Sequence, residues 1–503
     1  MKLNLQHQKN HYANLGKAAY CSVGFLILFI ALNPSQNVYT QIMAKNNLEQ
    51  FGFFCYSLDY FSYGIGCLAA SYILDKLGSK ISLSISATAD ALWILAILPP
   101  AYSSEIKHND DSFFISDGFI YTTQILIQAI QGFLLGLKWV AGSKYVSECA
   151  SEETKGFFAS FFWGIYMISM VLGSLIAAFV SMHFKQSSFL LIMAAIALFS
   201  VLIFATLVKP IPQERHLVAD NEIEDIKVLQ SLSSDNLKNL ETNDDLQSIH
   251  NFNENDDDLP KGQNLDNSSD IFQTQKLRKN PITLRQELCE IFILIKSKKM
   301  RTLIPFLLWI GTSSAVYTGI LVMIVIDTQS IGDDQYKFSQ AMLTMVSFGA
   351  GEIVGSISTG IMIDKYGNKK TAMLNIFFVL IQSILMAVYL INYQFSWFTY
   401  VVTFAWGLQD SSSNTLSIEI LGFEFSNNSQ SYAVSNLGTA LGGLIFNIIE
   451  GNVEGRESYL IYTSIVGLLG IICNITTLFF KFKPISKDLK YAKRESNFNQ
   501  EDK

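Results

Sequence analysis

Long apolar runs recur along the whole chain, and they limit its possible folds more than any other feature. Each run has ~20 mostly apolar residues, enough to cross a hydrocarbon core of ~30 Å as a helix. Barrel strands are excluded, because they alternate in polarity and span the bilayer in about ten residues. We therefore predict an all-α polytopic membrane protein with about twelve transmembrane helices, near residues 18–43, 49–75, 81–103, 119–140, 156–182, 187–208, 302–327, 337–363, 370–392, 395–416, 430–450 and 457–480.

The distribution of charge predicts the topology of these helices. Only 16% of the 503 residues are charged, against roughly 25% in soluble domains. Most of the acid behind the net charge of −7 lies between Lys209 and Asn280. The other connections on that side are basic, while those on the opposite side are acidic, so the positive-inside rule places both termini and the acidic tract in the cytoplasm. A plasma membrane and an endolysosomal membrane both fit this pattern.

A polar tract divides the predicted helices into two groups of six. It is rich in Asn, Asp, Ser and Gln and poor in aromatic residues, which predicts a disordered linker. Thr283 and Gln286 then form a capping-box pattern before an apolar helical face, which favours a helix on the membrane surface over a short soluble helix. The predicted regions are a six-helix half at 1–208, the linker at 209–280, the surface helix at 281–300, a second six-helix half at 301–480 and a basic tail at 481–503.

One short pattern, Asp-Lys-x-Gly-x-Lys, ends an apolar run in each half. It begins at Asp75 and again at Asp364, and extending the two copies upstream aligns Gly66 with Gly355. Such duplication indicates two related halves, which in membrane proteins usually form a site between them and rock against each other. The glycine can cap a helix end, and the aspartate can hold a neighbouring helix N-terminus. We call the ten residues involved the conformational latch: Gly66, Asp75, Lys76, Gly78, Lys80, Gly355, Asp364, Lys365, Gly367 and Lys369.

These patterns resemble the major facilitator superfamily, whose loop motif reads Gly-x-x-x-Asp-Arg/Lys-x-Gly-Arg/Lys-Arg/Lys. The second copy keeps the leading glycine as Gly360, whereas the first copy has Ser71. Ser79 and Asn368 each replace one basic residue of the motif. The resemblance implies two pseudo-symmetric six-helix halves. It also shows a departure, because Gln128 stands where many proton-coupled members carry arginine, which makes proton antiport of the usual kind less expected.

Three segments are similar to the Unc-93-like branch of that superfamily. They are 29–37, which ends in Gln-Asn, 132–145, where Trp139 precedes Gly-x-x-Tyr, and 406–415, which contains Gly-x-x-Asp and Asn-Thr. Members of this branch are known as potassium-channel regulators and receptor escorts, and some are regarded as transporters. The resemblance therefore implies a regulator or trafficking partner of an ion channel or receptor. The alternative is a secondary transporter of a small solute or ion.

Polar residues at membrane depth are the candidate functional groups, because burying charge there is costly. Glu352 precedes Asp364 by twelve residues, or about 18 Å of helix, which places it near mid-depth. Asp410 and Asp90 are expected to be less deep, and Lys138, Lys144 and Glu419 are expected near the cytoplasmic side. The alternative reading for each is a hydrogen bond between helices, which we favour for Asp90 and Lys138. The candidate cavity or ligand residues are Asp59, Glu352, Asp410, Asn414, Lys144 and Glu419.

The sequence gives no support to an enzymatic function. It has no clustered metal ligands, no phosphate-binding loop and no Gly-x-Ser-x-Gly elbow. We therefore expect no metal, no cofactor and no nucleic-acid partner. The expected partners are the lipid bilayer, a channel or receptor subunit, and a small solute or ion.

Overall fold

A computed structural model describes residues 12–46, 48–106, 113–183, 185–211 and 283–483. Residues 212–280 of the predicted linker, the first two residues of the predicted surface helix and the predicted tail beyond Lys483 lie outside the described residues. The chain divides into two units, Met1–Arg215 with Leu288–Lys503, and His216–Glu287. The described helices of membrane length all belong to the first unit, while the second is described only at the start of one helix.

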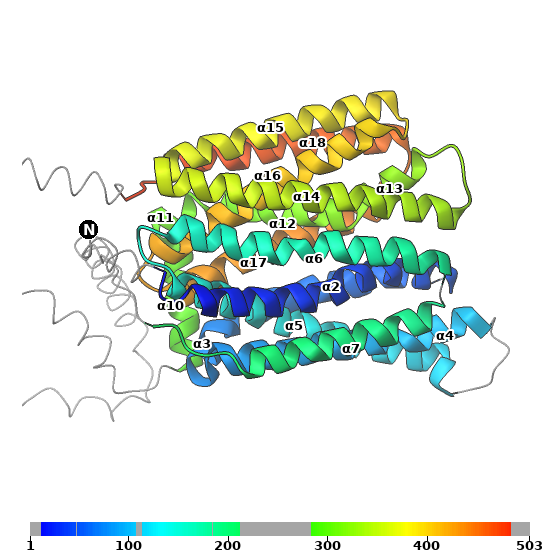
Figure 1. The fold of residues 1–503 in the computed structure, drawn as a ribbon, viewed down its shortest axis with the longest axis horizontal. Coiled ribbons are helices and arrows are strands. Elements are labelled where there is room, and N and C mark those ends of the chain that lie inside the picture. Colours follow the sequence, from blue (N-terminus) through cyan, green and yellow to red (C-terminus); the bar gives the residue numbers. More distant parts are fainter. Residues whose placement is uncertain (1–11, 47, 107–112, 184, 212–282, 484–503) are drawn as a thin grey trace, which may run out of the picture. The chain divides into compact units, whose positions relative to one another are not determined.

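Helices that run along a common long axis build the first unit (Figure 1). The N-terminal half contains α2 (Leu15–Lys45), α3 (Glu49–Ala96), α4 (Leu98–Ile106), η1 (Phe113–Ile115), α5 (Asp117–Cys149), α6 (Lys155–His183) and α7 (Gln186–Ala205). The C-terminal half contains α11 (Lys298–Arg301), α12 (Ile304–Thr318), α13 (Ile320–Asp327), α14 (Asp334–Tyr366), α15 (Asn368–Asn392), α16 (Trp397–Phe423), α17 (Asn428–Glu450), α18 (Arg456–Ile475) and η2 (Thr476–Phe479). We call the end that carries both Asp-Lys-x-Gly-x-Lys segments the motif end, and the opposite end the far end.

Ten segments of the described chain are long and apolar enough to cross a membrane. One of them, Phe54–Glu105, has 52 residues, about 78 Å of helix, which is enough for two crossings. The 27-residue α16 is not among the ten, although it packs against both α14 and α15. Counting the long segment twice and adding α16 agrees with the predicted number of about twelve. The all-α polytopic fold is confirmed.

Glycine breaks the helix at the equivalent point of both halves. Gly78 interrupts α3 with φ 74° and ψ 165°, and Gly367 separates α14 from α15 with φ 79° and ψ 170°. This left-handed region is costly for residues with a side chain. The structure differs from the prediction at the seventh span, which Gly319 divides into α12 and α13.

Matched glycine contacts reveal the duplication in three dimensions. In the N-terminal half, α5 meets α3 so closely that a Cβ at Gly132 would lie 2.2 Å from the Asp59 carbonyl oxygen. In the C-terminal half, a Cβ at Gly407 of α16 would lie 2.0 Å from the Phe348 carbonyl oxygen of α14. Asp59 and Phe348 are separated by the same interval as Asp75 and Asp364. Because only glycine allows such approach, these crossings fix the geometry of each half.

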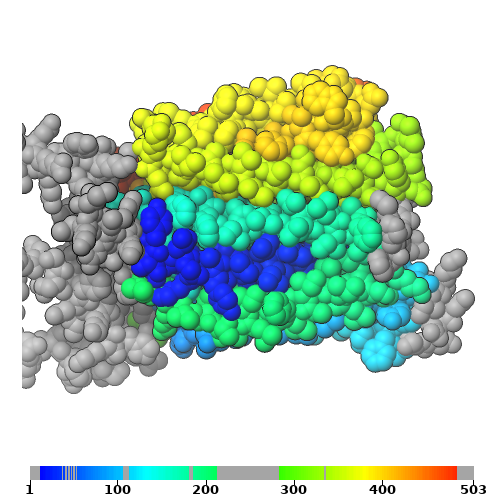
Figure 2. Space-filling view, viewed as in Figure 1, coloured from blue at the N-terminus to red at the C-terminus, as the bar shows by residue number. Residues whose placement is uncertain are grey.

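The two halves meet along α6 and α14 and along α3 and α17. In Figure 2 they form two bands, blue to green for the first half and yellow-green to orange for the second, in contact along their length. At the α6–α14 contact, a Cβ at Gly156 would lie 2.7 Å from the Gly360 carbonyl oxygen. Small residues therefore bring the halves together at the motif end.

The segment predicted as the surface helix contains a helix, α10 (Leu284–Lys296). Its location on the membrane surface stays a prediction. Its predicted capping box is formed. The backbone N–H of Gln286 donates to Thr283 Oγ1 at 3.3 Å, and the backbone N–H of Thr283 donates to Gln286 Oε1 at 2.9 Å. Further along, the Glu290 carboxylate accepts a hydrogen bond of 2.7 Å from Gln430 Nε2 on α17. The second part of α10 is thereby attached to the C-terminal half.

Candidate functional site

A cavity of about 130 Å³ lies between the two halves. Its walls come from α3, α5 and α6 on one side and from α12, α16 and α17 on the other. Wall residues recur at intervals of three or four, as Leu135, Trp139 and Ser143 do on α5, because such residues share one helix face. None of the lining side chains is charged. The polar and aromatic ones are Tyr60, Tyr63, Trp139, Ser143, Trp163, Tyr166, Ser314, Tyr317, Asn414, Ser417, Tyr432, Ser435, Asn436 and Thr439.

Two carboxyl groups lie directly behind the cavity wall. Glu352 on α14 and Asp410 on α16 are 0% and 1% exposed, and their side chains interact. Glu352 Oε2 accepts a hydrogen bond of 2.9 Å from Trp163 Nε1 on α6, which belongs to the opposite half. Asp410 accepts from Ser313 Oγ at 2.8 Å and from Asn414 Nδ2 at 3.0 Å. Trp163 and Asn414 also line the cavity. Each acid of the pair is therefore connected to the cavity through one side chain, Glu352 through Trp163 and Asp410 through Asn414.

The position of Asp410 in the structure differs from the depth that the sequence predicts for it. The sequence places Asp410 less deep than Glu352, but the structure brings their carboxyl groups together. The reason is that α14 and α16 cross closely, with a Cβ at Gly351 only 2.1 Å from the Phe404 carbonyl oxygen. Glu352 Oε1 has no hydrogen-bond partner among the described residues. Two buried carboxyl groups this close are costly to the fold when both are charged.

Asp59, a further candidate from the sequence, lies in the N-terminal half close to Asp90 and Lys138. Lys138 is fully buried, with Nζ 2.6 Å from Asp90 Oδ2. The helix-to-helix contact favoured for Asp90 and Lys138 is therefore present. The sequence analysis expected Lys138 near the cytoplasmic side. The structure instead holds it inside the N-terminal half, in this ion pair with Asp90.

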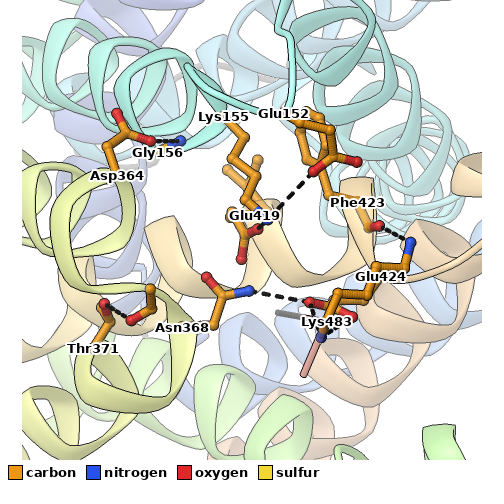
Figure 3. Close-up of polar contacts among 12 residues, drawn as sticks. Glu152, Lys155, Gly156, Asp364, Asn368, Thr371, Glu419, Phe423, Glu424 and Lys483 are labelled. Carbon is orange, nitrogen blue, oxygen red and sulfur yellow. Dashed lines mark hydrogen bonds and ion pairs between the residues drawn. The ribbon is translucent and has the colours of Figure 1, made fainter. Parts of the chain in front are cut away.

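Asp364 holds the N-terminus of α6 at the motif end. Its Oδ1 accepts a hydrogen bond of 2.9 Å from the Gly156 amide (Figure 3), and its Oδ2 accepts one of 2.8 Å from the Phe157 amide. These amides belong to the first turn of α6, where free N–H groups carry the positive end of the helix dipole. The contact joins the C-terminal half to the N-terminal half, in the geometry expected of the latch.

Asp75 does not make the equivalent contact among the described residues. It is 52% exposed, and its Oδ1 lies 3.3 Å from Lys144 Nζ on α5, within its own half. The alignment that matches Gly132 of α5 with Gly407 of α16 also matches Lys144 with Glu419. The C-terminal half therefore has an acid where the N-terminal half has a base, and Lys155 of the opposite half supplies the missing cation, with Nζ 2.6 Å from Glu419 Oε1 (Figure 3).

The other latch residues belong to the same helices, α3, α14 and α15, or to their breaks. Gly66 packs on the Phe133 carbonyl oxygen of α5, and Gly355 packs on the Leu408 carbonyl oxygen of α16. Lys76 Nζ donates a hydrogen bond to the Tyr72 hydroxyl. The remaining lysines, Lys80, Lys365 and Lys369, are exposed at the motif end.

Asn368, which replaces a basic residue of the motif, contacts a buried acid that sequence reasoning missed. Asn368 Nδ2 donates to Glu424 Oε1 at 3.3 Å (Figure 3). Glu424 also accepts from the Lys483 amide at 3.2 Å, at the beginning of the predicted tail. Burial raises the pKa of Glu424, and the neighbouring Glu419 adds to this effect.

Three residues of the site were missed by the sequence analysis, namely Trp163, Lys155 and Glu424. Trp163 sits in an aromatic run of α6 that reads as an ordinary lipid-facing segment. Lys155 and Glu424 lie at helix ends, where charged residues are commonplace. Their roles depend on contacts between segments far apart in the chain, and no local pattern indicates such contacts.

Comparison with known proteins agrees with this architecture. The model of the Major Facilitator Superfamily matches residues 21–447. An UNC93-like protein of Schizosaccharomyces pombe is 28% identical over 149 residues. That match spans 27% of this chain and only 26% of the relative. It supports the resemblance to the Unc-93-like branch.

Solved structures with the same fold include two of the transporter XylE. The proton:xylose symporter XylE bound to 6-bromo-6-deoxy-D-glucose superposes with a TM-score of 0.60 at 12% identity, covering 93% of this chain and 96% of that chain. The xylose transporter XylE from E. coli, in a partially occluded inward open conformation, superposes with a TM-score of 0.57 at 12% identity, covering 93% and 99%. At such identity the likeness concerns the fold alone.

Proposed function

The chain belongs to the major facilitator superfamily, and we propose that it is a secondary transporter of a small, uncharged polar solute. The observation that carries this proposal is the cavity built by both halves. Two halves that rock about a shared site expose it to each side of the membrane in turn. The proposal assigns the protein no enzymatic role.

The lining of the cavity supports the class of solute. Its rings, among them Trp139, Trp163 and Tyr317, offer flat apolar faces, while hydroxyl and amide groups such as Asn414 and Ser417 offer hydrogen bonds. A charged solute would have no counter-charge among the lining residues, so its desolvation would not be repaid. A volume of about 130 Å³ limits the solute to a small molecule.

The acid pair supports coupling of transport to a positive charge. Two adjacent buried carboxylates repel each other, so the Glu352–Asp410 pair is suited to hold one proton or one monovalent cation. Glu352 reaches the opposite half through Trp163, and Asp410 reaches the cavity through Asn414. A change of charge at the pair would thus act on both the interface and the cavity wall.

The latch supports a state in which the motif end is closed. Asp364 joins the halves through the first turn of α6, and Lys155 joins them through Glu419. The basic residues Lys76, Lys80, Lys365 and Lys369 at this end favour a cytoplasmic orientation. We place both termini in the cytoplasm on this basis, in a plasma membrane or an endolysosomal membrane.

The second candidate function is that of a regulator or trafficking partner of a channel or receptor. The similarity to the Unc-93-like branch favours it, as does Gln128, which is buried where many proton-coupled members carry arginine. On this hypothesis the polar groups of the bundle stabilise helix contacts, and the cavity has no solute.

Purification under native conditions separates the two functions. A lone protein whose thermal midpoint rises with one member of a panel of small polyols, sugars and amides supports transport. The rise should be lost in Trp139→Ala and kept in Asp75→Asn, since Asp75 lies away from the cavity. A stoichiometric membrane partner, with no response to any solute, supports the regulator.

A further inference from the structure

Three ionisable side chains meet inside the N-terminal half, in a cluster that the proposed transport path does not use. Asp59 and Asp90 come from the two segments of α3, and Lys138 comes from α5. Their exposures are 7%, 1% and 0%. Groups this deep in a membrane protein are costly unless they are neutralised or bind something.

Asp90 is fully provided with partners. Its Oδ2 is 2.6 Å from Lys138 Nζ, and its Oδ1 accepts a hydrogen bond of 3.1 Å from Gln131 Nε2. Lys138 Nζ also lies 4.8 Å from the centre of the Phe29 ring, a cation–π distance. Asp90 and Lys138 therefore form a complete, neutral pair.

One carboxylate oxygen of Asp59 lacks such a partner. Its Oδ1 is enclosed, yet no hydrogen-bond donor among the described residues reaches it. A Cβ at position 132 would lie 2.8 Å from this atom, so Gly132 keeps the position beside it free of a side chain. The charged groups that act on Asp59 are Lys138 of α5 and Asp90 of the second α3 segment. The titratable groups of its own segment that face it are Tyr56, Tyr60 and Tyr63.

The cluster therefore contains one negative charge more than Lys138 can neutralise. Two carboxylates and one ammonium leave an excess of one when all are ionised, and an uncompensated charge in an apolar interior is strongly unfavourable. A single added positive charge restores neutrality. A divalent ion would overshoot it, because Lys138 already supplies one of the two charges.

We propose that Asp59, beside the Asp90–Lys138 pair, is a site for one monovalent cation, either a proton or an alkali-metal ion, with Lys138 as an internal competitor. When the cation occupies Asp59, Lys138 remains with Asp90. When the cation leaves, Lys138 is shared by both carboxylates. The site lies within the N-terminal half and does not depend on a transported solute.

The site is connected to the cavity by its own helices. Tyr60 and Tyr63, on the segment that carries Asp59, line the cavity, as do Leu135 and Trp139 on either side of Lys138. A movement of Lys138 between its two partners would therefore be transmitted to the cavity wall.

Thermal unfolding of the purified full chain tests the proposal in two series. One titrates NaCl, KCl or LiCl against choline chloride at constant pH and ionic strength, and the other varies pH in choline chloride alone. We expect the wild-type midpoint to respond to one series, Asp59→Asn to reduce that response and Asp75→Asn, which alters a half-exposed ion pair at the motif end, to keep it in full. A response to alkali ions identifies a metal ion, and a response to pH alone identifies a proton. A response of the same size in Asp59→Asn as in the wild type, or a wild-type midpoint that responds to neither series, overturns the proposal.

A chemical measurement on the wild-type chain covers the case in which Asp59→Asn fails to fold. Dicyclohexylcarbodiimide modifies carboxyl groups embedded in membranes, and peptide mapping reports the extent at Asp59. We expect this extent to fall with added alkali ion if the ion is the ligand, and to change with pH if the proton is. An extent that is the same under all these conditions contradicts a cation site at Asp59.

Discussion

Replacing Asp364 with asparagine should open the motif end far more than the same change at Asp75. The Asp364 carboxylate accepts hydrogen bonds from two amides, Gly156 at 2.9 Å and Phe157 at 2.8 Å. An asparagine side chain has one acceptor oxygen, so at most one of these bonds survives. Asp75 instead makes a half-exposed ion pair with Lys144.

The magnitude follows from the bonds that are lost. A hydrogen bond to a charged group contributes about 1.5–3 kcal/mol, and loss of the charge at the helix N-terminus removes a further ~0.3–1 kcal/mol. The total of about 2–4 kcal/mol corresponds to a shift of roughly 30-fold or more between the closed and open states, at tenfold per ~1.4 kcal/mol. For Asp75→Asn, an exposed ion pair worth ~0–1 kcal/mol gives a shift of less than about fivefold.

Cysteine labelling at the two ends of the interface measures this shift. Ser160 at the motif end faces Gly360, where a Cβ would lie 2.2 Å from Ser160 Oγ. Toward the far end of the α6–α14 contact, Ser339 donates a hydrogen bond of 3.5 Å to the Ala178 carbonyl oxygen. Each is replaced by cysteine in a Cys289→Ser background, because Cys289 is exposed and the other five cysteines are buried.

Opposite changes at the two reporters are the expected result. In Asp364→Asn, the rate of maleimide labelling should rise at Ser160→Cys and fall at Ser339→Cys, and Asp75→Asn should leave both close to the parent rates. The background without a reporter gives the contribution of the buried cysteines. Equal labelling in Asp364→Asn and its parent would refute the latch and would leave the motif with a purely topological role.

Three further predictions follow from the same contacts. Glu352→Gln and Glu352→Ala should both lose function at near-normal stability if the acid pair is a coupling site, whereas normal function in Gln with unfolding only in Ala would reduce Glu352 to helix packing. Lys155→Met should destabilise the chain by about 3 kcal/mol, because it leaves the Glu419 carboxylate buried without a cation. The double variant with Glu419→Gln should recover most of the lost thermal stability. A double variant with a thermal midpoint no higher than that of Lys155→Met would contradict this. An engineered glycosylation acceptor should be modified next to Asp333 and not next to Asp256, and the reverse pattern would overturn the proposed topology.

The sequence predicted the architecture well because its determinants are local. Apolar run length fixed the helices, and Gly78 and Gly367 mark helix breaks that only glycine adopts without strain. The glycines aligned by the duplication, Gly66 and Gly355, do occupy matching helix crossings. The site depends on how each helix is rotated about its axis, which apolarity on all sides does not specify.

The misplacement of Asp410 illustrates this difference. Its distance from the helix ends suggested a position away from Glu352, whereas the crossing of α14 and α16 brings the two carboxyl groups together. The asymmetry of the latch has a similar origin. Both aspartates occupy the same motif position, but only Lys144 provides a cation within its own half, so only Asp364 turns to the opposite half.

Uptake by proteoliposomes that contain the purified chain tests the transport proposal most directly. The panel consists of radiolabelled small polyols, sugars and amides, compared with protein-free liposomes. We predict saturable uptake of at least one solute, lost in Trp139→Ala, which removes a cavity wall, and kept in Asp75→Asn. Uptake no faster than in protein-free liposomes for every member of the panel would contradict the assignment of this protein as a transporter of small, uncharged polar solutes.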